Sequence, residues 1–118
     1  MISLNLLVIK TNQMLEVAAF YTLLGFEFEY HQHGKGPFHY ASKSTPLLEI
    51  YPLPQQVSQP DKTTRLGFKV RELDKMVEHL EGRGMPVIAR PIMTEWGYHA
   101  IVQDPDGRKI ELTEQSFL

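Results

Sequence analysis

The fold is decided by the stretch FYTLLGF, residues 20–26 of a 118-residue chain. Phe20, Tyr21 and Leu24 continue an apolar helical spacing that begins at Val17, and Gly25 stands where a helix commonly ends. Aromatic and polar residues then alternate over residues 26–31, which predicts a half-buried strand directly after the helix. The apolar residues 2–9 predict a buried strand directly before it.

The same order of elements occurs twice along the chain. Two further strands are predicted at residues 38–41 and 47–51, and the Pro- and Gln-rich residues 52–62 have the character of a linker. An offset of about 60 residues then superposes a second set of elements on the first. This second set comprises strands at residues 65–70, 87–89, 98–103 and 109–113 and a helix with Leu73, Val77 and Leu80 on one face. The chain is therefore predicted to be one α+β domain, residues 1–118, with βαβββ modules at 1–53 and 63–118 joined by a linker at 54–62.

Composition and charge exclude several functions. The chain has no cysteine, which excludes thiol nucleophiles, zinc–thiolate sites and iron–sulfur clusters. Twelve basic and fourteen acidic residues are mixed along the sequence, so a nucleic-acid or membrane surface is not a predicted partner. The first apolar stretch is too short to span a bilayer and lacks the basic start of a signal peptide, so we expect a cytoplasmic protein.

These motifs together resemble one known group of proteins. The doubled βαβββ order, the helix end FYTLLGF and the sequence DPDGRKIEL at residues 104–112 are similar to the vicinal oxygen chelate superfamily. This group contains glyoxalase I, bleomycin-resistance proteins and extradiol dioxygenases. The resemblance covers the whole chain and implies an open barrel of the glyoxalase/bleomycin-resistance type, with the ligand on its concave face. It also implies that, in metal-dependent members, the side chains that bind the metal lie on the first and last strands of each module.

The four positions implied by this resemblance are not a good metal set. Glu49 and Glu111 match the two last strands, but Arg65 stands on a first strand where glyoxalase I-like members carry His. The remaining position is Leu6 or Asn5, depending on a one-residue shift of the alignment. A permanently charged guanidinium repels a cation, so no cofactor is expected, and a divalent metal on Glu49 and Glu111 is the alternative. Without a metal, four roles remain open for the two carboxylates. They pair with Arg65 to bind a ligand, act as general bases, form a structural salt bridge, or face water.

Aromatic residues and histidines extend the candidate site. Tyr51 shares a strand face with Glu49, and Asn5, Tyr51, His39 and Trp96 join Arg65 as predicted ligand-binding residues. Trp96 alternatively caps the core.

Each histidine also has a less specific interpretation. His39 and His99 either line the pocket or are exposed, and His79 is expected on the exposed side of the second helix. His31 and His33 share a strand face with two glutamates, which is typical of a solvated surface or of a surface metal patch.

The leading hypothesis is a small-molecule-binding protein without a tightly bound metal, acting as bleomycin-resistance proteins do. The alternative is a metal-dependent glyoxalase-like lyase or dioxygenase-like enzyme in which Glu49 and Glu111 are catalytic. A third class is a partner-binding module with a vestigial cavity. The resemblance also implies a homodimer in which Glu49 of one chain approaches Arg65 and Glu111 of its partner.

Overall fold

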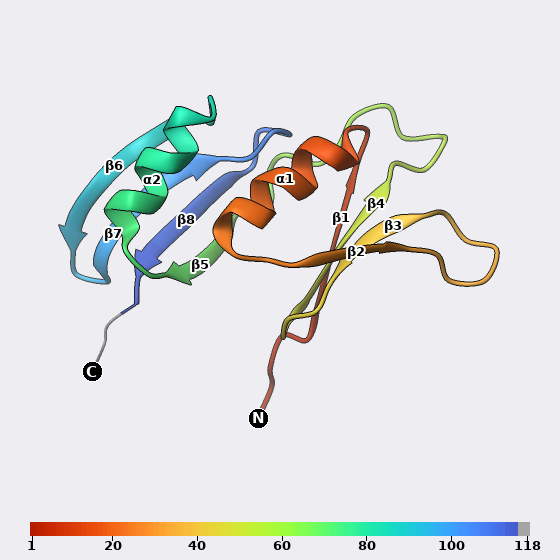
Figure 1. Ribbon diagram of the computed structural model, residues 1–118, viewed down its shortest axis with the longest axis horizontal. Coiled ribbons are helices and arrows are strands. Elements are labelled where there is room, and N and C mark those ends of the chain that lie inside the picture. Colours follow the sequence, from red (N-terminus) through yellow and green to blue (C-terminus); the bar gives the residue numbers. More distant parts are fainter. Residues whose placement is uncertain (116–118) are drawn as a thin grey trace. The chain divides into compact units, whose positions relative to one another are not determined.

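The computed structural model describes residues 1–115, and within them two four-stranded sheets each carry one helix (Figure 1). The chain divides into two compact units, Met1–Asp61 and Lys62–Leu118, which we describe separately. No helix in the described part of the chain is long and apolar enough to cross a membrane. In chain order the elements are β1 (Leu6–Thr11), α1 (Met14–Leu24), β2 (Phe28–His31), β3 (His39–Ser42), β4 (Leu47–Pro52), β5 (Leu66–Val70), α2 (Leu73–Gly82), β6 (Val87–Thr94), β7 (Gly97–Gln103) and β8 (Lys109–Glu114).

The first unit is an open sheet with the strand order β1-β4-β3-β2. β1 pairs with β4 in parallel, and β2, β3 and β4 are antiparallel to their neighbours. The register places Val8 on β1 and Ala41 on β3 opposite Glu49 on β4. Residues that pair directly across neighbouring strands point to the same face of a sheet. The side chains of Val8, Ala41 and Glu49 therefore share one face.

The helix α1 covers the other face of the first sheet. Phe20 and Tyr21 on α1 and Ile50 on β4 are fully buried there. The helix ends at Gly25, whose φ of +120° is readily adopted only by glycine. The stretch FYTLLGF therefore supplies both the core of this unit and the turn into its second strand.

The second unit repeats this topology with the strand order β5-β8-β7-β6. β5 pairs with β8 in parallel, and the register places Gly67 and Ile101 opposite Glu111 on β8. Leu80 on α2 and Leu112 on β8 are fully buried on the helix-covered face. The predicted α+β class with two βαβββ modules is confirmed, and each sheet is open at both ends of its strand order.

Two strands differ in extent from the prediction. β1 begins at Leu6 rather than at residue 2, because its pairing with β4 begins at Leu6 and Leu47. β6 reaches Thr94, whereas the sequence predicted a strand only over residues 87–89. Pro91 lies inside β6 and is tolerated because β6 is an edge strand with register shifts on both sides of Ala89.

The predicted turn before the last strand contains a buried network of ion pairs and hydrogen bonds. The Arg108 guanidinium donates from Nη1 to Asp104 Oδ2 at 3.0 Å and to Asp106 Oδ2 at 2.9 Å. Asp104 Oδ1 also accepts the backbone N–H groups of Asp106 and Arg108, each at 3.0 Å. Burial lowers the pKa of Arg108, but these hydrogen bonds and the two negative charges outweigh burial and raise it. The network fixes the start of β8.

Candidate functional site

The second unit contains a pocket on the face of its sheet that α2 does not cover. Its volume is about 520 Å³. Charged and polar side chains from β5, β7 and β8 lie beside an indole ring in its lining. The lining residues are Arg65, Leu66, Gly67, Phe68, Lys69, Trp96, His99, Glu111 and Thr113.

Glu111 links the polar side chains of this pocket. Its Oε2 lies 3.2 Å from Arg65 Nε, and its Oε1 lies 3.3 Å from His99 Nε2. His99 Nδ1 in turn lies 3.2 Å from Thr113 Oγ1. When the imidazole is neutral, His99 Nε2–H donates to Glu111 Oε1, and Thr113 Oγ1–H donates to His99 Nδ1. The arrangement positions one carboxylate, one imidazole and one guanidinium around a shared space.

Strand register explains why these side chains meet. His99 pairs with Thr113, and Lys69 also pairs with Thr113 from the other side. Gly67 pairs with Glu111 and contributes no side chain, so the floor of the pocket stays open. A Cβ built on Gly67 would lie 3.9 Å from the backbone oxygen of Glu111, which is an ordinary contact distance. A larger residue at this position would therefore project into the pocket without disturbing the sheet.

Trp96 is the aromatic side of the pocket. It lies between β6 and β7, where its backbone N–H donates to Thr94 Oγ1 at 3.1 Å. The residue is 76% exposed, so it lines the pocket and does not cap the core. An exposed indole beside a guanidinium and a carboxylate suits a ligand with a flat apolar body and polar substituents.

The first unit gathers a different set of side chains around Glu49. His39 Nε2 lies 3.6 Å from Glu49 Oε2, and His33 Nε2 lies 3.9 Å from the same oxygen. The ring of Tyr51 stacks on that of His39, with centroids 3.9 Å apart. Burial, and after it the negative charge of Glu49, raise the pKa of Tyr51.

Each predicted site residue can now be placed within its unit. Arg65, Trp96 and Glu111 lie together in the second unit. Glu49 and Tyr51 lie together in the first, next to His39, which is fully buried.

Asn5 does not face Glu49. The parallel register pairs Val8 with Glu49 and Gly67 with Glu111, so Leu6 is the counterpart of Arg65. Asn5 lies one residue before Leu6, immediately ahead of β1, and its backbone oxygen accepts the N–H of Leu47 at 2.9 Å. By strand alternation its side chain belongs on the opposite side of the sheet from Leu6 and Glu49.

Several residues of these two sites were missed or left undecided by sequence reasoning. Lys69 and Thr113 could have been found from the alternation of side chains around Glu111, once β5 is known to pair with β8. His99 belongs to the pocket, whereas His79 is exposed on α2 as predicted. The grouping of His31 and His33 with His39 required the register of β2 and β3, which the sequence does not specify.

The positions that the family resemblance implies for a metal do not fit one in this chain. In the second unit the Arg65 guanidinium is paired with Glu111, so a fixed positive charge lies where a cation would bind. In the first unit the corresponding position is Leu6, whose side chain has no ligand atom. These four positions together therefore do not form a fitting set of metal ligands.

Comparison with solved structures shows which proteins share this architecture. The antibiotic-binding protein TnmS3 from Streptomyces sp. CB03234 is 23% identical, with a TM-score of 0.74 and 98% of each chain covered. TioX from Micromonospora sp. ML1 is 16% identical, with a TM-score of 0.73 and coverage of 97% of this chain and 99% of that one. Glyoxalase I from Leishmania major is 20% identical, with a TM-score of 0.73 and coverage of 97% and 87%. At these identities the likeness concerns the fold.

The fold and the open-faced sheets define a two-module protein of the glyoxalase type. The family model of the glyoxalase/bleomycin resistance protein/dioxygenase superfamily matches residues 3–112. The chain belongs to this superfamily. No curated protein sequence matches it.

Proposed function

We propose that this protein binds a small organic molecule in the pocket of its second unit, and that binding there does not require a metal. The observation that carries the proposal is the pairing of Arg65 with Glu111 in a pocket that also exposes Trp96. The ligand class that fits is a molecule with a flat apolar body and an anionic or hydrogen-bonding substituent. Such a protein would sequester an antibiotic or a similar metabolite.

The chemistry of the pocket supports this ligand class. A guanidinium carries five N–H donors, and the contact with Glu111 is made by Nε, at one edge of the group. Lys69 adds a second positive charge on the same face of the sheet. The indole of Trp96 offers a large rigid surface for stacking. The pocket volume of about 520 Å³ lies within the usual range for small-molecule sites.

The similar structures support the same function. One of them is described as an antibiotic-binding protein, and its fold covers nearly the whole of this chain. An exposed ion pair such as Arg65–Glu111 contributes only about 0–1 kcal/mol to stability. A role in recognition therefore accounts for this arrangement better than a role in folding.

Replacing Arg65 by leucine is expected to weaken binding of an anionic ligand by about 10–100-fold, because one charge-assisted hydrogen bond contributes about 1.5–3 kcal/mol. The measurement is a thermal-shift screen of aromatic carboxylates and polycyclic antibiotics, followed by calorimetric titration of the compounds that stabilise the protein. Binding to the native state raises the melting temperature by mass action.

The matched control for this experiment is Arg90→Leu. Arg90 pairs with Glu81 in the same unit, is similarly exposed and lies outside the pocket. Arg90→Leu should leave the affinity unchanged. Equal affinity of the Arg65→Leu variant and the wild type for every stabilising compound would contradict the proposed site.

A homodimer is the expected assembly of this protein. Leu6, Val8 and Leu47 are exposed apolar side chains on β1 and β4, and Leu6 and Leu47 pair across the two strands. A second copy of the chain would remove this surface from water. Light scattering coupled to size exclusion should give a dimer at micromolar concentration, and the double substitution Leu6→Lys, Val8→Lys should give a monomer. A monomeric wild-type protein would refute this expectation.

A further inference from the structure

A second group of potential ligands lies in the first unit and is separate from the proposed small-molecule pocket. It consists of His31, His33, His39 and Glu49, and each contributes one ligand atom. All four atoms lie within 4.8 Å of one another. We call this group the histidine cluster. Glu27 and Glu29, which share the strand face of His31, are not part of it.

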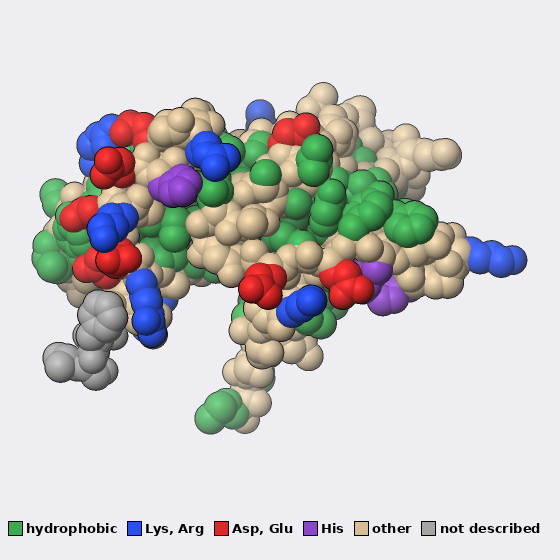
Figure 2. Space-filling model, viewed as in Figure 1, with side chains coloured by type: hydrophobic (Ala, Val, Ile, Leu, Met, Phe, Trp, Pro, Cys, Tyr) green, Lys and Arg blue, Asp and Glu red, His purple; other side chains and the backbone are tan. Residues whose placement is uncertain are grey.

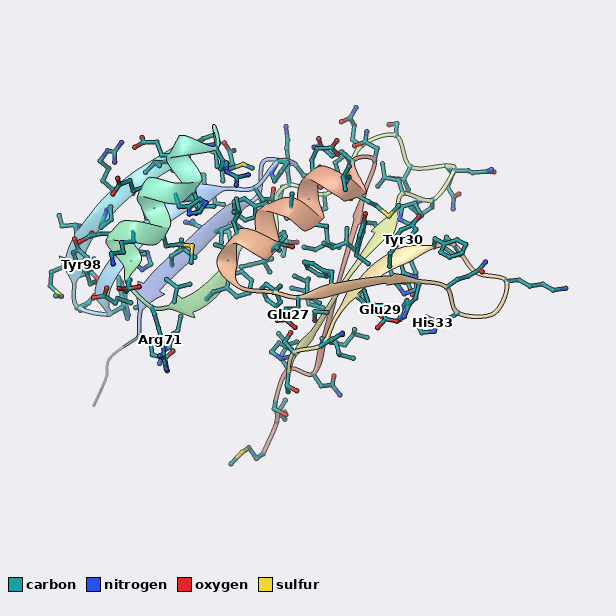
Figure 3. All side chains as sticks on the ribbon, viewed as in Figure 1. Glu27, Glu29, Tyr30, His33, Arg71 and Tyr98 are labelled. Carbon is teal, nitrogen blue, oxygen red and sulfur yellow. The ribbon has the colours of Figure 1, made fainter. Side chains whose placement is uncertain are left out.

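The β2–β3 hairpin assembles the histidine cluster. His31 on β2 pairs with His39 on β3, so both imidazoles lie on the same face of the sheet. Glu49 pairs with Ala41, two residues along β3 from His39, and therefore points to this face as well. His33 follows β2 by two residues and extends the same alternation into the turn. Figure 3 shows His33 and Glu29 directed to one side of β2 and Tyr30 directed to the other.

The orientation of His39 is fixed by its surroundings. The residue is fully buried, and its Nδ1 lies 3.1 Å from the backbone oxygen of Pro37. Because a carbonyl oxygen only accepts hydrogen bonds, Nδ1 carries the proton and the Nε2 lone pair is directed toward His31 and Glu49. Stacking on Tyr51, with an angle of 11° between the rings, holds the ring plane. A hydrogen bond from the second ring nitrogen to a backbone carbonyl is the usual support of a metal-ligating histidine.

The distances within the histidine cluster are close to those of a tetrahedral metal site. Ligand atoms at about 2.0–2.1 Å from such an ion lie about 3.3–3.4 Å from one another. His31 Nε2 and His39 Nε2 are 3.0 Å apart, and His39 Nε2 and Glu49 Oε2 are 3.6 Å apart. His33 Nε2 lies farther from Glu49 Oε2, at 3.9 Å, and the His33 side chain is 65% exposed at the start of the turn. A small movement of this exposed side chain would complete the coordination.

We propose that His31, His33, His39 and Glu49 bind one divalent transition-metal ion, with Zn²⁺, Co²⁺ and Ni²⁺ as the fitting ions. Three imidazoles favour these ions over Mg²⁺ and Ca²⁺, which prefer oxygen ligands. This site lies within one unit and uses β2, the β2–β3 turn, β3 and β4. It shares only Glu49 with the positions implied by the family resemblance, and it departs from the sequence-based expectation that no metal is bound.

The competing explanation is a hydrogen-bond network without an ion. His31 Nε2–H would then donate to His39 Nε2 at 3.0 Å, and Glu49 would stay beyond hydrogen-bond distance of His33 and His39, at 3.9 and 3.6 Å. Both explanations agree with the same distances, but they differ in the response to added metal. A network of hydrogen bonds takes up no stoichiometric ion.

The test is calorimetric titration of the untagged protein with Zn²⁺ after removal of metal by a chelator, supported by the visible absorption of Co²⁺. We expect one ion per chain, a Co²⁺ spectrum typical of four-coordination, and no binding of Mg²⁺. His33→Gln and Glu49→Gln should each weaken Zn²⁺ binding by about 100-fold or more, since loss of an outer partner of a ligand alone costs 10–100-fold. His39 is left unchanged because its burial makes a substitution there a test of folding.

The control variant is His79→Gln, which removes an exposed histidine from α2 in the other unit. It should bind Zn²⁺ as the wild type does, and all three variants should keep the far-UV circular dichroism of the wild type. Stoichiometric binding that persists in both the His33→Gln and Glu49→Gln proteins would overturn the assignment of the site. Failure of the wild type to bind Zn²⁺ or Co²⁺ would overturn the proposal itself.

Discussion

The Arg108→Leu variant is expected to lose about 3–5 kcal/mol of unfolding free energy, which is a large part of the stability of a small protein. The side chains of Arg108, Asp104 and Asp106 are each at most 3% exposed. Leucine would remove the guanidinium that contacts both buried carboxylates, whereas the backbone hydrogen bonds to Asp104 would remain. The cost arises because two buried negative charges lose the positive charge beside them.

Urea denaturation followed by circular dichroism measures this loss, with Arg90→Leu as the matched control. Arg90 and Glu81 also form an ion pair, but both side chains are about half exposed or more. The control should lower the unfolding free energy by at most about 1 kcal/mol. Similar losses in the two variants would show that burial of the Arg108 network contributes nothing specific.

Ile50→Ala and Leu112→Ala form the second pair with a large expected effect. Each is expected to lower the unfolding free energy by about 2–5 kcal/mol, because both side chains are fully buried and their truncation leaves a cavity. The two residues follow Glu49 and Glu111 in the repeated sequence and face the helix of their own unit. Leu15→Ala, at an exposed position of α1, should cost less than about 1 kcal/mol.

The same urea experiment also reports on the two units. A single transition that shifts for both variants would show that the units unfold together. A loss below about 1 kcal/mol for either buried residue would contradict the assignment of that residue to the core.

The fold could be predicted because the sequence is locally consistent. Alternation around Glu49 and around Glu111 placed the two carboxylates on the face opposite the buried Ile50 and Leu112, and the structure has this arrangement. The helical spacing up to Gly25 predicted the end of α1. Period-two and period-3.6 patterns repeat in both halves, so each element supports the assignment of its counterpart.

The sites could be predicted only in part, because they depend on pairing between distant strands. The partners of Glu111 include His99 from β7, and this contact requires the register of β7 with β8. The histidine cluster requires that β2 and β3 pair with His31 opposite His39, a register set by the turn between them. Sequence spacing alone gives the face of a strand but not its partner.

The distribution of charged side chains on the surface also bears on how a ligand is recognised. Figure 2 displays charged side chains distributed over both units, without a single-sign field on the face in view. This agrees with the mixed sequence and a net charge of −2. The proposed recognition of a ligand therefore relies on particular side chains in a pocket rather than on overall charge.

The proposed ligand-binding site lies beside Trp96, Arg65 and Glu111. Trp96 is the only tryptophan, so a ¹H–¹⁵N spectrum has one indole N–H resonance that reports on this pocket. The measurement is a titration with the compound that stabilises the protein most strongly, in the wild type and in Gly67→Val, whose side chain would project into the pocket. We predict a saturable one-to-one shift of the indole resonance in the wild type and none in Gly67→Val. Stabilisation by the compound with no change in the indole resonance, or an equal shift in both proteins, would contradict the proposed site.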